Sequence, residues 1–242
     1  MGAAAPPSVE QLRARLRVAG DAGRARALHR FFQADPGGYG AGDTFVGVRV
    51  PDVRRLARAA RGLALDDVAV LLRSPVHEER LLALLVLVDA YARGDGATRD
   101  VVFAFYLAHV AQVNNWDLVD ASAPYVVGAH LAARDRGLLD DLAASPSVWE
   151  RRIAVLATFH FVRRGEGADT LRLAARLLAD RHPLIHKAVG WMLREVGKRD
   201  PGALARFLDA HAGAMPRTML RYAVERLAPA ERQRYMRADR PG

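Results

Sequence analysis

A proline-led helical motif recurs four times in this 242-residue chain. The segments are SPVHEERLLALLVLV, SPSVWERRIAVLATF, RHPLIHKAVGWMLREV and MPRTMLRYAVERL. In each, a proline at the expected helix start is followed four to six positions later by a basic residue and then by an apolar stripe. Proline suits the first helical position because its missing N–H would have no partner there. The motif predicts four helices that begin at Pro75, Pro146, Pro183 and Pro216.

The spacing of the motifs predicts how these helices are arranged. With the segment NNWDLVD around Trp116 counted as a further member, successive motifs lie 30 to 41 residues apart. Periods of this length indicate stacked helical hairpins of the HEAT or armadillo type. The sequence therefore predicts an all-α, HEAT-like helical-repeat solenoid. Taken singly, each repeated base is more simply a solvated helix residue, but as a row they predict a concave basic face formed by Arg80, Arg152, Lys187 and Arg221.

The rest of the chain also favours helices. Alanine, leucine and arginine are good helix formers, and apolar residues recur at spacings of three and four. The Gly-rich segment DPGGYGAGDTFVGVRVP is expected to be a loop with at most a short extended piece. We expect one helical-repeat domain over residues 1–242, with residues 1–8 as a disordered tail.

Charge and composition narrow the classes of function. The net charge of +9 and the pI near 10.7 indicate an acidic polymer as partner. The chain has no cysteine, which excludes disulfides, thiolate zinc sites, Cys-ligated iron–sulfur clusters and cysteine nucleophiles. It contains no uncharged apolar run of membrane-spanning length, and its N-terminus, MGAAAPPSVE, has no signal-peptide features. We expect no membrane contact and a cytoplasmic, nucleoid-associated protein.

Two tryptophans stand beside charged residues at helical spacing. Trp116 and Asp120 are four residues apart, so a helix would place both on one face. Trp191 shares a predicted helical stripe with three bases, Lys187, Arg194 and Lys198. An indole among bases suits a site where a ring meets a sugar, a base or a cation while the bases hold phosphates. For Trp116 alone, a core tryptophan beside a solvated aspartate is the simpler interpretation.

These motifs together resemble a known family. NNWDLVD, VWERRIAVL and IHKAVGWMLREVGK, in this order and spacing, are similar to the HEAT-repeat alkylpurine DNA glycosylases of the AlkD-type DNA alkylation repair family. The segment FVGVRVPDVRRLAR also resembles the N-terminal signature of that family. The similarity runs from about residue 25 to 225, nearly the whole chain.

The resemblance implies a role for each matching residue. Trp116 and Trp191 match the tryptophans that flank the sugar of the damaged nucleotide, and Asp120 matches the catalytic carboxylate. The chain departs from one member of the family at Asn115, where that member has an aromatic residue, and at His160, where it has a base. These differences bear on affinity and substrate range. The residues expected to bind DNA are Arg152, Arg194, Lys198, Lys187, Arg49 and Arg54.

The activity implied by the resemblance is hydrolysis of the N-glycosidic bond of cationic N3- or N7-alkylpurines in duplex DNA. The base would stay in the stack, and the reaction would initiate base excision repair. One carboxylate suffices because the alkylated purine is already cationic and leaves as a neutral base. We expect a monomer that needs no cofactor or metal. Two alternatives stay open: a non-catalytic member that binds branched or distorted DNA, and a protein–protein HEAT scaffold.

Other polar residues are expected to have structural roles. His182 and His186 are four apart but lack an evident third ligand, so we expect no metal site there. Asp117 is expected to support a helix start or bind a backbone group. His77, Glu78 and Glu79 resemble a first-turn acidic cap, and the glycines at 37–42 lack the lysine of a phosphate-binding loop.

Overall fold

The computed structural model describes residues 5–237, which divide into two compact units within residues 1–126 and 127–242. Residues 5–237 contain no β-strand, only an isolated parallel bridge between Thr44 and Val76. The predicted all-α fold is confirmed. Both compact units are built of packed helices, and the single repeat domain expected over residues 1–242 stays a prediction.

In the first unit the helices are α1 (Val9–Ala19), α2 (Ala22–Phe31), α3 (Val50–Ala59), α4 (Leu65–Leu72), α5 (His77–Arg93), α6 (Gly96–Ala108), the 3₁₀-helix η1 (Val110–Gln112) and α7 (Trp116–Ser122). A π-helical segment, η2 (Pro124–Gly128), spans the boundary. The second unit contains α8 (Ala129–Leu131), α9 (Leu138–Ala144), α10 (Val148–Ala157), α11 (Phe159–Val162), α12 (Ala168–Arg176), α13 (Pro183–Gly197), α14 (Pro201–His211), α15 (Arg217–Ala223) and α16 (Pro229–Met236).

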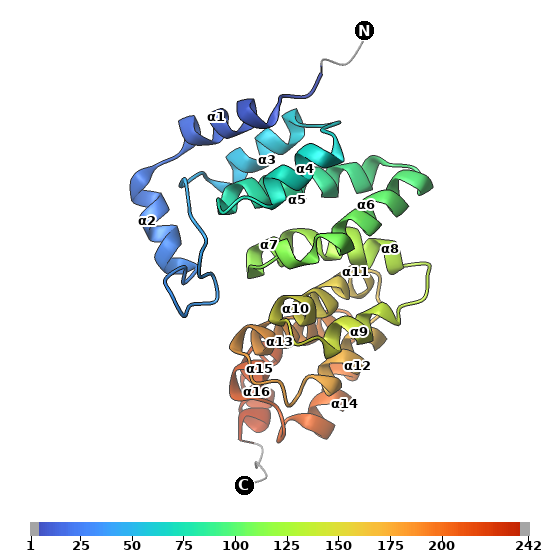
Figure 1. The fold of residues 1–242 in the computed structure, drawn as a ribbon. Coiled ribbons are helices and arrows are strands. Elements are labelled where there is room, and N and C mark those ends of the chain that lie inside the picture. The colour runs from blue at the N-terminus through green and yellow to red at the C-terminus, as the bar shows by residue number, and fades with distance from the viewer. Residues whose placement is uncertain (1–4, 238–242) are drawn as a thin grey trace. The chain divides into compact units, whose positions relative to one another are not determined.

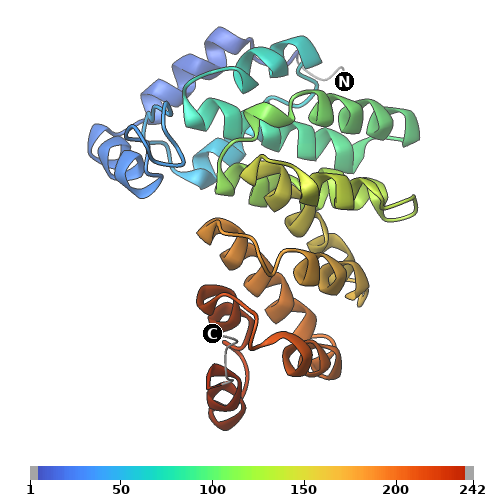
Figure 2. The ribbon, with the colours of Figure 1, turned by 60° about the horizontal axis from the view of Figure 1, so that its bottom comes forward.

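Helix α5 is the centre of the first unit. It contacts α3, α4, α6 and α7, while α1 packs across α3 and α4 (Figure 1). Residues 77–87 of α5 are all buried, as expected for a helix surrounded by others. The Gly-rich loop before α3 lies beside α2 in both ribbon views (Figure 1, Figure 2). The unit therefore brings the loop, the start of α5 and α7 together.

Two layers of helices form the second unit. Helices α10, α13 and α15 pack side by side, and α9, α12 and α14 pack against them. Helices α13 and α15 approach closely at Gly190, where an added Cβ would lie 2.4 Å from the carbonyl oxygen of Met219. The glycine before Trp191 is therefore required by helix packing.

The helix starts differ in detail from the proline-based prediction. Pro183 is the first residue of α13, as predicted, but Pro216 is the N-cap of α15. Pro75 and Pro146 lie one residue before their N-caps. The N-cap of α10 is Ser147, whose hydroxyl accepts the N–H of Glu150. Serine satisfies a free helix N–H, which proline cannot do.

At the N-terminus, the disordered tail expected over residues 1–8 is wrong at Ser8. Residues 1–4 lie outside the described part of the chain, whereas Ser8 already caps α1. Its hydroxyl accepts the N–H of Gln11 at 3.3 Å, and its own N–H donates to the Gln11 side chain at 3.0 Å. This reciprocal pair is a capping box. Among the described helices, none is both long and apolar enough to cross a bilayer.

Candidate active site

Trp116 is the first residue of α7, and two aromatic rings at the C-terminal end of α2 fix its position. Its indole stacks on Phe32, with ring centroids 5.3 Å apart and planes 28° apart. Phe31 meets the indole edge-on at 5.8 Å. The buried Asn115 precedes α7 and accepts the Trp116 N–H with its side-chain oxygen at 2.8 Å. Both the ring and the backbone of Trp116 are therefore held.

Asp120 lies one turn after Trp116 on the same helix. Both side chains are partly exposed, and their spacing of four residues within this helix places them on the same face of α7. The opposite side of α7 is anchored to α6, where Tyr106 and Ser122 share a hydrogen bond of 3.0 Å. The Ser122 hydroxyl also donates to the Leu118 carbonyl at 2.6 Å. An aromatic ring and a carboxylate thus project from one fixed helix.

Beneath α7 lies a buried charged cluster that corrects our interpretation of His77. The imidazole is 2% exposed and bonds two carboxylates: Nδ1 lies 3.0 Å from Asp43 and Nε2 lies 2.8 Å from Asp117. Burial opposes the charged form, but the hydrogen bonds to Asp117 and Asp43 outweigh it and raise the pKa of His77 to about 9. His77 is therefore a buried imidazolium that bridges two carboxylates, and not part of a first-turn acidic cap.

The two glutamates after His77 are also buried and paired. Glu78 accepts the N–H groups of Val46, Gly47 and Val48 at 3.1, 2.7 and 3.2 Å. Glu79 pairs with Arg13 of α1 at 2.9 Å. Glu78 therefore satisfies three successive backbone N–H groups of the segment that leads into α3.

In the second unit, a single carboxylate organises the surroundings of Trp191. The Trp191 indole N–H donates to Glu195 at 3.2 Å, and the Lys198 ammonium donates to the same Glu195 oxygen at 2.6 Å. Arg194 Nε lies 3.7 Å from this oxygen. Phe159 packs against the indole at 5.8 Å between ring centroids. Sequence analysis missed Glu195, although its spacing of four from Trp191 was an available signal.

The predicted DNA-binding bases fall into different environments. Arg49, Arg54 and Lys187 are exposed, and no ion pair of theirs occurs within residues 5–237. Lys198 forms an ion pair with Glu195, and Arg194 forms one with Glu225 in addition to its contact with Glu195. The first three are therefore open to a phosphate without giving up an existing partner.

Two of the four bases predicted to form an exposed basic row, Arg80 and Arg152, are instead buried. Arg80 is 4% exposed and donates to Asp43 at 2.6 Å and to the Ser74 carbonyl at 2.8 Å. Arg152 is also 4% exposed and donates to the Leu184 carbonyl at 2.8 Å. Both repeat positions hold neighbouring helices in place. The predicted phosphate contact of Arg152 stays a prediction.

The histidine pair at the start of α13 has the expected structural role. His182 is the N-cap and accepts the Leu184 N–H at 3.2 Å, and His186 bonds the Asp180 carbonyl at 2.5 Å. Over residues 5–237, no group of three or more His, Asp or Glu side chains is arranged to hold a metal ion.

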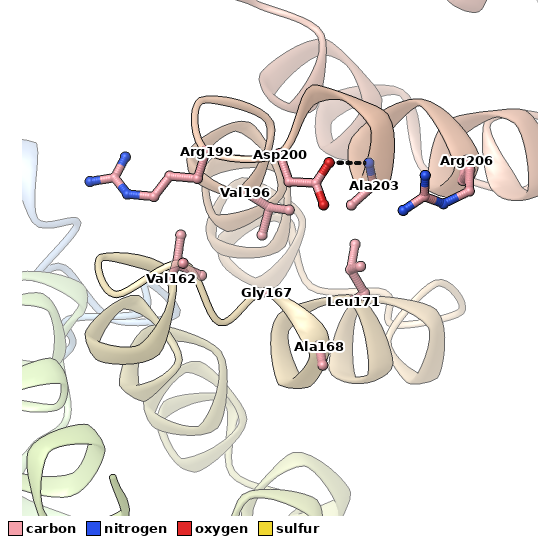
Figure 3. A pocket seen from close by; sticks show the side chains of 10 residues that line it. Val162, Gly167, Ala168, Leu171, Val196, Arg199, Asp200, Ala203 and Arg206 are labelled. Carbon is pink, nitrogen blue, oxygen red and sulfur yellow. Dashed lines mark hydrogen bonds between the residues drawn. The ribbon is translucent and has the colours of Figure 1, made fainter.

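The second unit contains a pocket of about 230 Å³ (Figure 3). Val162, Leu171 and Val196 point into it, and Arg199 and Arg206 stand at its sides. Asp200 accepts the Ala203 N–H at 2.8 Å and so caps α14. No predicted catalytic or DNA-binding residue lines this pocket.

Known proteins place the chain in a family. The family model described as DNA alkylation repair enzyme matches residues 12–227. A predicted DNA alkylation repair enzyme from Enterococcus faecalis is 15% identical, with a TM-score of 0.67 over 87% of this chain and 97% of that one. AlkD2 from Streptococcus mutans is 16% identical, with a TM-score of 0.53 over 90% of this chain and 99% of that one. No curated protein matches the chain. The solved structures share its helical-repeat fold, and the match to the family model shows that the chain belongs to the family of DNA alkylation repair enzymes.

Proposed function

We propose that this protein is a DNA glycosylase that hydrolyses the N-glycosidic bond of N3- or N7-alkylated purines in duplex DNA. The observation that carries the proposal is the pairing of Trp116 and Asp120 on one face of α7, in a member of the DNA alkylation repair family. The product would be an abasic site, the first intermediate of base excision repair.

The proposed chemistry requires little of the protein. Breaking the bond between C1′ and the purine nitrogen leaves positive charge on the deoxyribose. The Asp120 carboxylate would stabilise that charge, orient the water that attacks C1′, and accept the proton that this water loses before passing it to solvent. The bonding electrons pass to the purine, which neutralises its existing positive charge. The base leaves without protonation, so a second carboxylic acid is unnecessary.

Trp116 and Trp191 would present aromatic faces to the cationic nucleotide. Cation–π attraction of this kind contributes about 0.5 to 2 kcal/mol for each ring. The exposed Arg49, Arg54 and Lys187 would bind backbone phosphates. We propose that recognition occurs from the backbone side with the base left in the stack, which would tolerate bulky adducts.

A base-release assay tests the proposal. A duplex oligonucleotide containing 7-methylguanine is incubated with excess protein, and free base is measured over time. Asp120→Asn should lower the single-turnover rate by about 100-fold, because it removes charge stabilisation from the transition state. Its affinity for the duplex should change little. Asp66→Asn, at an exposed position of α4, is the matched control and should keep the wild-type rate.

Two results would contradict the proposal. If Asp120→Asn keeps more than about a tenth of the wild-type rate, Asp120 does not supply the expected electrostatic stabilisation. If the wild-type protein binds the duplex but releases neither 7-methylguanine nor 3-methyladenine, it is instead a non-catalytic DNA-binding member of the family.

A further inference from the structure

His77 lies where three segments of the first unit meet. It is the first residue of α5, and its two ring nitrogens bond Asp43 of the Gly-rich loop and Asp117 of α7. The backbone repeats the link to the loop, because the His77 N–H donates to the Thr44 carbonyl at 2.9 Å. One buried side chain therefore connects the loop to the helix that carries Trp116 and Asp120.

Two routes lead from His77 to Trp116. The first is polar: Asp117, the residue after Trp116, accepts from His77 with one oxygen and from the Leu118 N–H with the other, at 2.8 Å each. The second is aromatic: Phe32 stacks on His77 at 4.7 Å and on Trp116 at 5.3 Å between centroids. Loss of the imidazolium would disturb both the start of α7 and the ring beneath the indole.

The charges around His77 balance only while it is protonated. Asp43 and Asp117 face the ring nitrogens, and Arg80 is the remaining charged group bonded into the cluster, through Asp43. Two carboxylates then face two cations. A neutral ring would lose one N–H donor and leave a carboxylate without its cation in a buried site, which is costly.

We propose that His77 is a positioning residue for Trp116, which as an imidazolium bridge between Asp43 and Asp117 fixes the indole that contacts the damaged nucleotide. The consequence for base release rests on the proposed function. The placement of Trp116 by His77 does not depend on the proposed function, and a separate experiment measures it.

The experiment uses Trp116 fluorescence in the full-length protein. Trp149→Phe with Trp191→Phe leaves Trp116 as the single tryptophan of the three. In this background, His77→Gln and Asp117→Asn should each raise acrylamide quenching of Trp116 about twofold, because each removes the same charged hydrogen bond between the two side chains. The double variant should show no more than the larger single effect, since residues in one network are not additive.

The matched control is Glu79→Gln. Glu79 is buried on the same first turn of α5, but its partner is Arg13. The substitution breaks that ion pair and should lower the stability of the protein without changing the quenching of Trp116. Equal quenching in the control and His77→Gln would overturn the proposal, as would wild-type quenching in His77→Gln. If His77→Gln does not fold, Asp117→Asn and a pH titration of the background protein decide, and quenching must rise as pH passes about 9.

Base release separates positioning from binding. With tryptophans 149 and 191 restored, His77→Gln should lower the single-turnover rate about tenfold and DNA affinity less than threefold, because the reacting geometry is changed more than the phosphate contacts. If the wild-type protein releases no base, the proposed function fails while the quenching result still decides the role of His77.

Discussion

Glu195 binds two neighbouring groups, the Trp191 indole N–H and the Lys198 ammonium, through one oxygen. The side chain is 7% exposed. A buried carboxylate is costly unless it is paired and hydrogen-bonded, and here both conditions are met. The orientation of Trp191 and the charge presented beside it therefore depend on the same group.

Substitution of Glu195 should separate these two effects. Glu195→Ala removes the bond to the Trp191 indole N–H and the bond to the Lys198 ammonium. It should lower the single-turnover rate about tenfold, equivalent to about 1.4 kcal/mol. Glu195→Gln keeps an oxygen that accepts the indole N–H and should retain most of the rate. Glu225→Gln, which affects Arg194 but has no bond to Trp191, is the control. Equal rates for the alanine and wild-type proteins would show that Trp191 needs no anchor.

His77 also makes stability depend on pH. Burial lowers the pKa of His77, but the hydrogen bonds to Asp117 and Asp43 outweigh burial and raise this pKa from 6.5 to about 9 in the folded protein. The stabilisation is therefore complete below about pH 6.5 and is lost as pH rises through about 9. Thermal unfolding of the wild-type protein should show Tm falling across this window. His77→Gln should show a smaller fall, and equal slopes would contradict the assignment.

At the scale of helices, the local sequence pattern predicted where helices occur better than it predicted the residues at which they begin. Apolar periodicity indicated α5, α10, α13 and α15, and all four are helices. The exact starts depend on which residue can satisfy a free N–H, which is why Ser147 and not Pro146 caps α10.

Long-range pairs were beyond the reach of sequence periodicity. The bond from His77 to Asp117 joins residues 40 positions apart. Periodicity reports spacing along one helix and carries no information on which buried groups meet across helices. The local pair of Trp116 and Asp120 could therefore be predicted, whereas the cluster beneath it could not.

The close packing of α13 and α15 at Gly190 predicts the effect of a substitution there on stability. In Gly190→Ala the new Cβ would lie 2.4 Å from the Met219 carbonyl oxygen and 2.6 Å from Tyr222 Cβ. Helix α15 must shift, so the variant should lose about 1 to 3 kcal/mol of stability, measured by denaturant unfolding. Gly96→Ala, with no atom within 4 Å of its Cβ, should be neutral or mildly stabilising. Equal stabilities would refute the steric argument.

For the whole molecule, the net charge of +9 favours DNA, but individual bases differ in availability. Arg54→Ala and Lys187→Ala should each weaken duplex binding and lower the salt slope of log Kobs by about 0.9, as loss of one phosphate contact requires. Arg55→Ala is the control, because Arg55 is already paired with Asp52 at 2.8 Å. If neither exposed base changes the slope, these residues do not meet the phosphate backbone.

The stacking of Phe32 on Trp116 also determines how a ligand can approach. One side of the indole is already covered by a ring of its own protein, and Phe31 closes part of its edge. In the proposed reaction, a sugar would therefore rest only on the remaining side. Such one-sided access would impose a single direction of approach on any strand that reaches α7, whatever the size of the group attached to its base.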